Sequence, residues 1–214
     1  MLYFCPIHGA WFEYQNNVYL NYRNERADEN IIDLWNTVSP PPAPELKLAV
    51  VDSKITALLI LDMETTICKS PRCIASINNI SNLLMNARKN NMLVVYSLTH
   101  NGNPQDIARK IAPLPSDPIV KSNVDKFFQT NLDEILQKKS IKTVIVTGFA
   151  ANGAVLHTAT SAAFHGYNVI VPVDCMSTAN ILYAEQYTAW HMLNSPATRN
   201  RAVLTKSNLI DFMH

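Results

Sequence analysis

The stretch that decides the fold runs Thr143-Val-Ile-Val-Thr-Gly-Phe-Ala-Ala-Asn-Gly-Ala-Val-Leu-His-Thr-Ala-Thr-Ser-Ala-Ala-Phe164. Its first five residues are apolar or β-branched, which is typical of a strand that is buried on both faces. Gly148 interrupts this run, and residues 152–164 are rich in small side chains that suit a closely packed helix. The stretch therefore predicts a buried strand, a tight turn and a helix.

The same alternation of strand and helix extends in both directions along the chain. Strands are expected at residues 56–62, 92–96, 168–173 and 202–205, and helices at residues 74–90, 130–139 and 181–194. Residues 100–120 are expected to be mostly loop, with a short helix around Ile107. Strands that are apolar on both faces and separated by helices form parallel sheets with both faces covered. We therefore predict a three-layer α/β/α domain with a mainly parallel central sheet.

Residues 1–45 differ in composition from the rest and end in the stiff, extended segment Ser39-Pro-Pro-Pro-Ala-Pro44. This part of the chain holds aromatic side chains that would be costly to leave in water. They are Trp11, Phe12, Tyr14, Tyr19, Tyr22 and Trp35. We predict an N-terminal arm and linker at residues 1–45, packed on the domain or on a neighbouring subunit, and one α/β domain at residues 46–214.

The charge and the apolar runs argue against two classes of partner. The 18 Lys and Arg residues nearly balance the 17 Asp and Glu residues, for a net charge of +1. No strong field therefore draws the chain to nucleic acid or to a membrane surface. The longest apolar run near the start of the domain, residues 57–61, is too short to span a bilayer.

The N-terminus and the cysteines predict a cytoplasmic protein. The first residues lack the basic start and the clean apolar stretch of a secretion signal. The four cysteines are irregularly spaced, and we expect free thiols in a reducing compartment. They are Cys5, Cys68, Cys73 and Cys175.

Three stretches reach the carboxyl ends of the expected strands, where parallel sheets bind ligands. Asp62 ends the first strand, and a carboxylate that is partly desolvated there needs a partner. Lys121 precedes the segment Phe127-Phe-Gln-Thr-Asn-Leu132, and the turn at residues 148–154 follows the third strand. Together they predict one site made of a carboxylate, an ammonium group and a turn.

The order and spacing of these motifs resemble the isochorismatase-like cysteine hydrolases, which include nicotinamidases, carbamoylsarcosine amidases and isochorismatases. That family has a strand ending in Asp-Met-Gln and a lysine six residues before the Phe of a Phe-x-x-Thr-x-Leu pattern. Asp62-Met-Glu64 and the spacing from Lys121 to Phe127 are similar to these motifs. Later motifs follow in order as Thr147-Gly148, Thr158-Ala159, Gly166-Tyr167-Asn168-Val169 and Val173-Asp174. The resemblance covers about residues 55–205 and implies the isochorismatase-like, Rossmann-like α/β fold.

The resemblance also implies a chemistry for the site. In that family a cysteine at a helix N-terminus is the nucleophile, an aspartate is the general base and a lysine supports the charge. These last two roles fall on Asp62 and Lys121. A cis peptide bond between Phe149 and Ala150 would direct the amides of Ala150 and Ala154 toward an oxyanion.

The sequence departs from the family at the nucleophile. The position six residues after Gly148, where the family has its cysteine, is Ala154. A methyl group cannot attack a carbonyl, and Cys68, Cys73 and Cys175 follow other strands. Two explanations stay open: the alanine is natural and marks a divergent or non-catalytic branch, or it replaces a cysteine in a variant made to trap a ligand.

Four further residues are candidates for binding a substrate: Glu64, His100, Asn152 and His157. Glu64 stands where the family has glutamine, and its alternative role is a plain polar contact. His157 lies one helical turn after Ala154, so it either faces the pocket or packs as a hydrogen-bonded histidine. Nothing after Asp62 matches the Asp-x-His metal motif of nicotinamidases, and no phosphate-binding glycine loop occurs. We expect no metal and no cofactor.

Two functions from different classes are consistent with these observations. The first is a hydrolase that acts on a small amide, imide or vinyl-ether metabolite. The second is a binding or scaffold protein that keeps the pocket without the reaction, and a weaker third possibility is an unrelated doubly wound domain. The arm and the aromatic helix at residues 183–191 also suggest a homo-oligomer, either a dimer or a tetramer.

Overall fold

A computed structural model describes residues 2–5, 10–13 and 28–213 of the 214-residue chain. For residues 2–5 and 10–13 it describes the backbone alone. The chain divides into two compact units, residues 1–42 and residues 43–214, which are described separately. The aromatic side chains of the arm at positions 11, 12, 14, 19 and 22 lie outside the described residues or side chains, and Trp35 is exposed.

The first unit contains a β-hairpin that the sequence did not predict. Strands β1 (Leu2–Cys5) and β2 (Ala10–Glu13) pair antiparallel, and the short 3₁₀-helix η1 (Trp35–Thr37) follows later in the chain. The sequence of this arm has no clean period, so no regular element was expected there.

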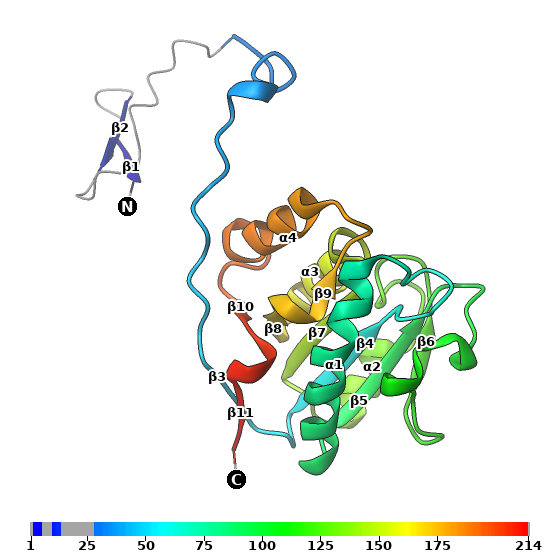
Figure 1. Cartoon of the computed structure of the whole chain (residues 1–214). Coiled ribbons are helices and arrows are strands. Elements are labelled where there is room, and N and C mark those ends of the chain that lie inside the picture. The colour runs from blue at the N-terminus through cyan, green and yellow to red at the C-terminus, as the bar shows by residue number, and fades with distance from the viewer. Residues whose placement is uncertain (1, 6–9, 14–27, 214) are drawn as a thin grey trace. The chain divides into compact units, whose positions relative to one another are not determined.

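The second unit is built on a parallel sheet with the strand order β10-β8-β7-β4-β5-β6 (Figure 1). Every neighbouring pair along this order is parallel. The strands are β4 (Thr56–Leu61), β5 (Leu93–Leu98), β6 (Ile119–Lys121), β7 (Thr143–Phe149), β8 (Asn168–Pro172) and β10 (Ala202–Thr205). All six residues of β4 are buried, as expected for a strand that is covered on both faces.

Helices cover both faces of this sheet. Helix α1 (Pro71–Lys89) contributes to the hydrophobic core on one face, together with β3 (Ala49–Val51) and β11 (Ile210–Phe212). The core on the other face includes side chains of α2 (Leu132–Lys138), α3 (Leu156–Phe164) and α4 (Leu182–Asn194). The predicted three-layer α/β/α fold is confirmed. Among the described residues, none of the helices is long and apolar enough to cross a membrane.

The shortest strands were not predicted from the sequence. Strand β6 has three residues, and β9 (Met176–Ser177) has two and pairs with the end of β7. Strands β3 and β11 form a separate parallel pair. Strands this short carry too few residues for a periodic signal, and their pairing is decided by distant parts of the chain.

The short helix expected around Ile107 is not present as predicted. Two 3₁₀-helices, η2 (Pro104–Asp106) and η3 (Arg109–Ile111), flank this residue. Ile107 itself forms an antiparallel bridge with Glu64. Because the backbone of Ile107 pairs with Glu64, a continuous helix does not form through this segment.

The prediction of free thiols is wrong for Cys68 and Cys73, which form a disulfide with their Cα atoms 5.4 Å apart. Ser70 caps α1 by accepting a hydrogen bond from the backbone N–H of Cys73, and this turn brings the two thiols together. Cys175 is a free and buried cysteine. Disulfides persist mainly in oxidising compartments, so this disulfide argues against a cytoplasmic location. The cytoplasmic location therefore stays a prediction.

Candidate active site at the strand ends

Asp62 lies directly after β4 and is held by the neighbouring strand. Its backbone has a positive φ of 48°, and its N–H donates to the carbonyl oxygen of Ser97 at 3.2 Å. The hydroxyl of Ser97 donates to Oδ1 of Asp62 at 2.6 Å. The carboxylate is therefore fixed at the carboxyl ends of the strands, and Asp62 is only 4% exposed.

The other carboxylate oxygen of Asp62 is paired with Lys126. Nζ of Lys126 lies 2.7 Å from Oδ2 of Asp62, and the side chain of Lys126 has no exposed surface. The same ammonium group donates to the carbonyl oxygens of Ser122, at 3.0 Å, and of Asn123. Its three protons thus have three acceptors, which is what a buried ammonium group requires.

Burial raises the pKa of Asp62 above its ordinary value. The charge of Lys126 and the hydrogen bonds from Lys126 and Ser97 act in the opposite direction, and the charge of Glu64 adds to the rise. The net direction is upward because desolvation of the carboxylate outweighs its partners. A raised carboxyl pKa is suited to a general base, since such a group accepts a proton more readily than an ordinary aspartate.

The prediction that Lys121 is the partner of Asp62 needs correction, because the described ion pair of Asp62 is with Lys126. The register places Leu61 opposite Ser97 and Leu98 opposite Lys121. Lys121 therefore lies two strands away from Asp62, roughly 10 Å between backbones. Its side chain is exposed and lines an open hollow of about 670 Å³ with Gln129, Thr130 and Asn131, among others.

The last residues of β7 and the turn that follows them have the tight geometry that the sequence indicates. Gly148 has a φ of 122°, and a Cβ atom there would lie 2.0 Å from the carbonyl oxygen of Leu61. The peptide bond between Phe149 and Ala150 is cis, as the resemblance implied. A short segment, η4 (Ala151–Val155), is kinked at Gly153, where φ is −115° and ψ is −106°, and it leads into α3. The buried Ala154 lies within it.

The loop that carries Lys126 also contacts the start of α3. The backbone N–H of Lys126 donates to the hydroxyl of Thr158 at 3.2 Å, and this hydroxyl donates to the carbonyl oxygen of Val124 at 3.4 Å. Val124 is also the side chain nearest to Gly153, together with Ala150. The structure thus brings Asp62, Lys126 and the turn after β7 into one region. The lysine in this region is not Lys121, which its spacing to Phe127 had indicated.

The four candidate binding residues divide into one buried and three exposed side chains. Glu64 has no exposed surface, and its Oε1 accepts hydrogen bonds from the backbone N–H and the hydroxyl of Thr99, at 3.1 and 2.7 Å. His100, Asn152 and His157 are exposed. No contact that joins these three to Asp62 appears among the described residues. Their part in a site stays a prediction.

Three polar residues near the strand ends were not predicted from the sequence. Lys126 and Ser97 are the partners of Asp62. Ser177 lies on β9 opposite Phe149, and its buried hydroxyl has no hydrogen-bond partner among the described residues. A lysine beside two phenylalanines carries no local sign of burial, so Lys126 could be found only by following the path of the loop in space.

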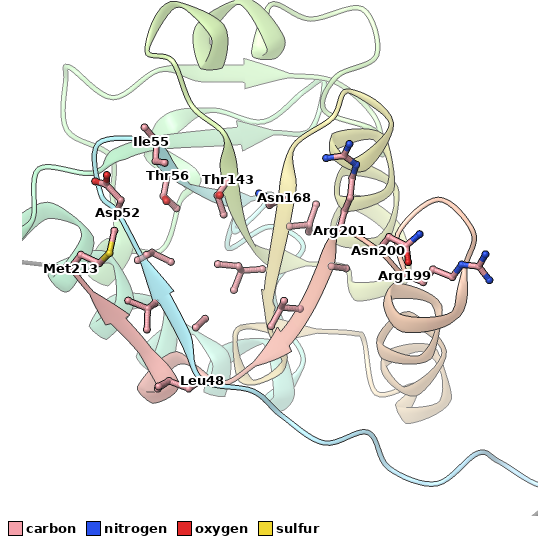
Figure 2. A pocket seen from close by; sticks show the side chains of 17 residues that line it. Leu48, Asp52, Ile55, Thr56, Thr143, Asn168, Arg199, Asn200, Arg201 and Met213 are labelled. Carbon is pink, nitrogen blue, oxygen red and sulfur yellow. The ribbon is translucent and has the colours of Figure 1, made fainter. Parts of the chain in front are cut away.

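A second hollow lies at the opposite end of the strands, where β4, β7 and β8 begin. This cavity has a volume of about 520 Å³. Figure 2 shows Thr56, Thr143 and Asn168, which line it at the amino ends of their strands. Arg201 also lines it, and its guanidinium donates to the carbonyl oxygen of Gly166. Because parallel sheets bind ligands beyond the carboxyl ends of their strands, this cavity is not the candidate active site.

No group of three or more His, Cys, Asp or Glu side chains within the described ranges is arranged to hold a metal ion. The polar groups at the strand ends are instead two carboxylates, one ammonium group and several hydroxyls. These groups can bind a small polar molecule and exchange a proton with it.

Comparison with known proteins places the chain in a family. The isochorismatase domain matches residues 56–206. The uncharacterized isochorismatase family protein YaaI of Bacillus subtilis is 29% identical over 148 residues, which are 57% of this chain and 80% of that protein. The ureidoacrylate amidohydrolase RutB of Cronobacter turicensis is 30% identical over 107 residues, which are 50% of this chain and 46% of that protein.

Solved structures agree with this assignment at the level of the fold. An isochorismatase family protein from Burkholderia thailandensis superposes with a TM-score of 0.65 at 19% identity, covering 77% of this chain and 97% of its own. The family match extends over more than half of the chain, from β4 to the end of β10. The chain therefore belongs to the isochorismatase family.

Proposed function

We propose that this hydrolase-like family member binds a small amide, imide or vinyl-ether metabolite at the carboxyl ends of β4 and β7. The observation that carries the proposal is the buried pair of Asp62 and Lys126 beside the turn that contains Ala154. A desolvated carboxylate held by a single ammonium group is expensive to maintain in a core, and such groups are typical of reactive sites.

Hydrolysis at this site proceeds without a covalent thiol intermediate, because Ala154 stands where the resemblance places the nucleophile. In the proposed step Asp62 accepts a proton from a water molecule, whose oxygen attacks the substrate, and the proton is then passed to the leaving group. Lys126 supports the negative charge of Asp62 before the transfer. The raised pKa of Asp62 supports this role.

The test is turnover of a panel of small amides, imides and isochorismate by the wild type and by an Asp62→Asn variant. We expect the variant to lose most of the activity, about 100-fold or more, since an amide side chain cannot take the proton. The matched control is Asp211→Asn, which changes an exposed aspartate on β11. Activity that survives unchanged in the Asp62→Asn variant would remove Asp62 as the base.

A second candidate function is binding without turnover. Lys126 has all three protons engaged, and both oxygens of Asp62 already accept hydrogen bonds or an ion pair, which favours a site that is rigid rather than reactive. Such a protein would be stabilised by a ligand by RT ln(1 + [L]/Kd) and would show no product. A thermal-shift screen combined with product analysis on the same panel separates the two functions.

A further inference from the structure

Glu64 is a second buried carboxylate beside the candidate site, and one of its oxygens is unpartnered. Oε1 accepts two hydrogen bonds from Thr99, whereas Oε2 has no hydrogen-bond partner among the described residues. The residue has no exposed surface. A buried carboxylate oxygen without a donor is rare in native proteins and calls for a ligand, an ion or a bound water.

The fold holds this carboxylate in place from several sides. A Cβ atom at Gly102 would lie 1.8 Å from Oε1 of Glu64, so the absence of a side chain at Gly102 makes room for the carboxylate. The backbone carbonyl oxygen of Glu64 accepts hydrogen bonds from the N–H groups of Ile67 and Cys68, and Glu64 bridges Ile107. Glu64 therefore cannot turn outward to water without disturbing the loop.

The charges at the strand ends do not balance. Asp62 and Glu64 are two acidic groups, and Lys126 is the single basic group paired with either of them among the described ion pairs. The two acidic residues lie close enough for the charge of Glu64 to act on Asp62. An anionic ligand placed beside this excess of negative charge would be repelled, whereas N–H donors would be attracted.

We propose that Oε2 of Glu64 accepts a hydrogen bond from an N–H group of the ligand, so that the site selects a neutral amide over the carboxylate of the same shape. The inference rests on the proposed function and narrows its substrate class. It favours amides, imides and ureides, and it disfavours vinyl ethers that carry carboxylates. Glu64 is then a specificity-determining residue whose carboxylate is not exchangeable with the amide of glutamine, because a glutamine can also present a donor to a carboxylate.

The experiment measures Kd by calorimetry for two probes of nearly equal shape, benzamide and benzoate. We expect the wild type to bind benzamide at least about tenfold more tightly than benzoate, since a hydrogen bond to a charged group is typically worth this factor or more. In a Glu64→Gln variant the ratio of the two Kd values should fall by about tenfold. The control Glu134→Gln makes the same chemical change at an exposed position on α2 and should leave the ratio unchanged.

A second variant covers the case in which Glu64→Gln does not fold, which circular dichroism and urea unfolding reveal. Gly102→Ala displaces the carboxylate of Glu64 without changing its charge, and we expect the same loss of preference. If the ratio is unchanged in the folded variants, Oε2 binds only a water and the inference is overturned. A wild type that binds both probes equally, or neither, overturns it as well. The proposed function is judged separately by turnover in the Asp62→Asn variant.

Discussion

At the scale of single residues, the decisive contact is the ion pair between Asp62 and a lysine. The spacing from Lys121 to Phe127 favoured Lys121, whereas the described partner of Asp62 is Lys126, five residues later. The free energy of unfolding can decide between the two lysines because their surroundings differ. Lys126 is buried among acceptors, and Lys121 is an exposed residue at the end of β6.

We predict that Lys126→Met lowers the free energy of unfolding by about 3 to 5 kcal/mol, since it leaves the carboxylate of Asp62 buried without its partner. The matched variant Lys121→Met should change it by no more than about 0.5 kcal/mol. Urea unfolding at neutral pH measures both. Equal effects of the two substitutions would contradict the pairing of Asp62 with Lys126.

At the scale of elements, an ion pair joins the start of α1 to α4. Arg72 donates to both carboxylate oxygens of Glu185, and the backbone N–H of Thr178 donates to the same carboxylate at 3.0 Å. Burial by itself raises the pKa of Glu185, but the hydrogen bonds from Arg72 and Thr178 outweigh it, so the net pKa is lowered. The pair ties α4 and the residue after β9 to the loop that the Cys68–Cys73 disulfide closes, which contains Arg72.

The pH dependence of this pair has a definite sign. A carboxyl group whose pKa is lowered in the folded state contributes stability above its ordinary pKa, and this contribution is lost as the pH falls through the lowered value. We predict that Arg72→Ala lowers the free energy of unfolding at pH 7 by roughly 0.5 to 1 kcal/mol, a modest amount because Arg72 is half exposed.

The difference between the wild type and Arg72→Ala should shrink once the pH falls below about 4. Urea unfolding at pH 7 and at pH 3 measures it. Lys138→Ala, which removes an exposed pair with Glu134, is the control with little effect at either pH. A difference that is as large at pH 3 as at pH 7 would show that Arg72 acts through packing alone.

The elements that could be predicted from the sequence are those whose signal is local. The apolar runs at residues 56–61 and 143–147 are set by neighbouring residues, so β4 and β7 begin where they were predicted. Strand β7 continues past the predicted end through Gly148 to Phe149, because these two residues pair with β9. The pairing of Glu64 with Ile107 and the bridge between Cys68 and Cys73 depend on how loops are folded back in space. For the same reason the choice of Lys126 over Lys121 could not be predicted from spacing.

At the scale of the whole molecule, the arrangement that matters is the parallel order β10-β8-β7-β4-β5-β6. It places β7 beside β4, so the turn that contains Ala154 follows the strand adjacent to the one that ends at Asp62. It also places β5 on the other side of β4, so that Ser97 and Thr99 reach the two acidic residues. The fold therefore assembles the site from strands that are distant in sequence.

The central proposal is that Asp62, Lys126 and the turn that contains Ala154 form one reactive site, which lacks a nucleophile at position 154. The most direct measurement is the rate of amide hydrolysis by an Ala154→Cys variant. We predict a rate at least roughly tenfold above that of the wild type on one or more amides of the panel, and loss of this gain after treatment with iodoacetamide. An Ala154→Cys variant that folds with the wild-type Tm and hydrolyses no amide faster than the wild type would contradict the account.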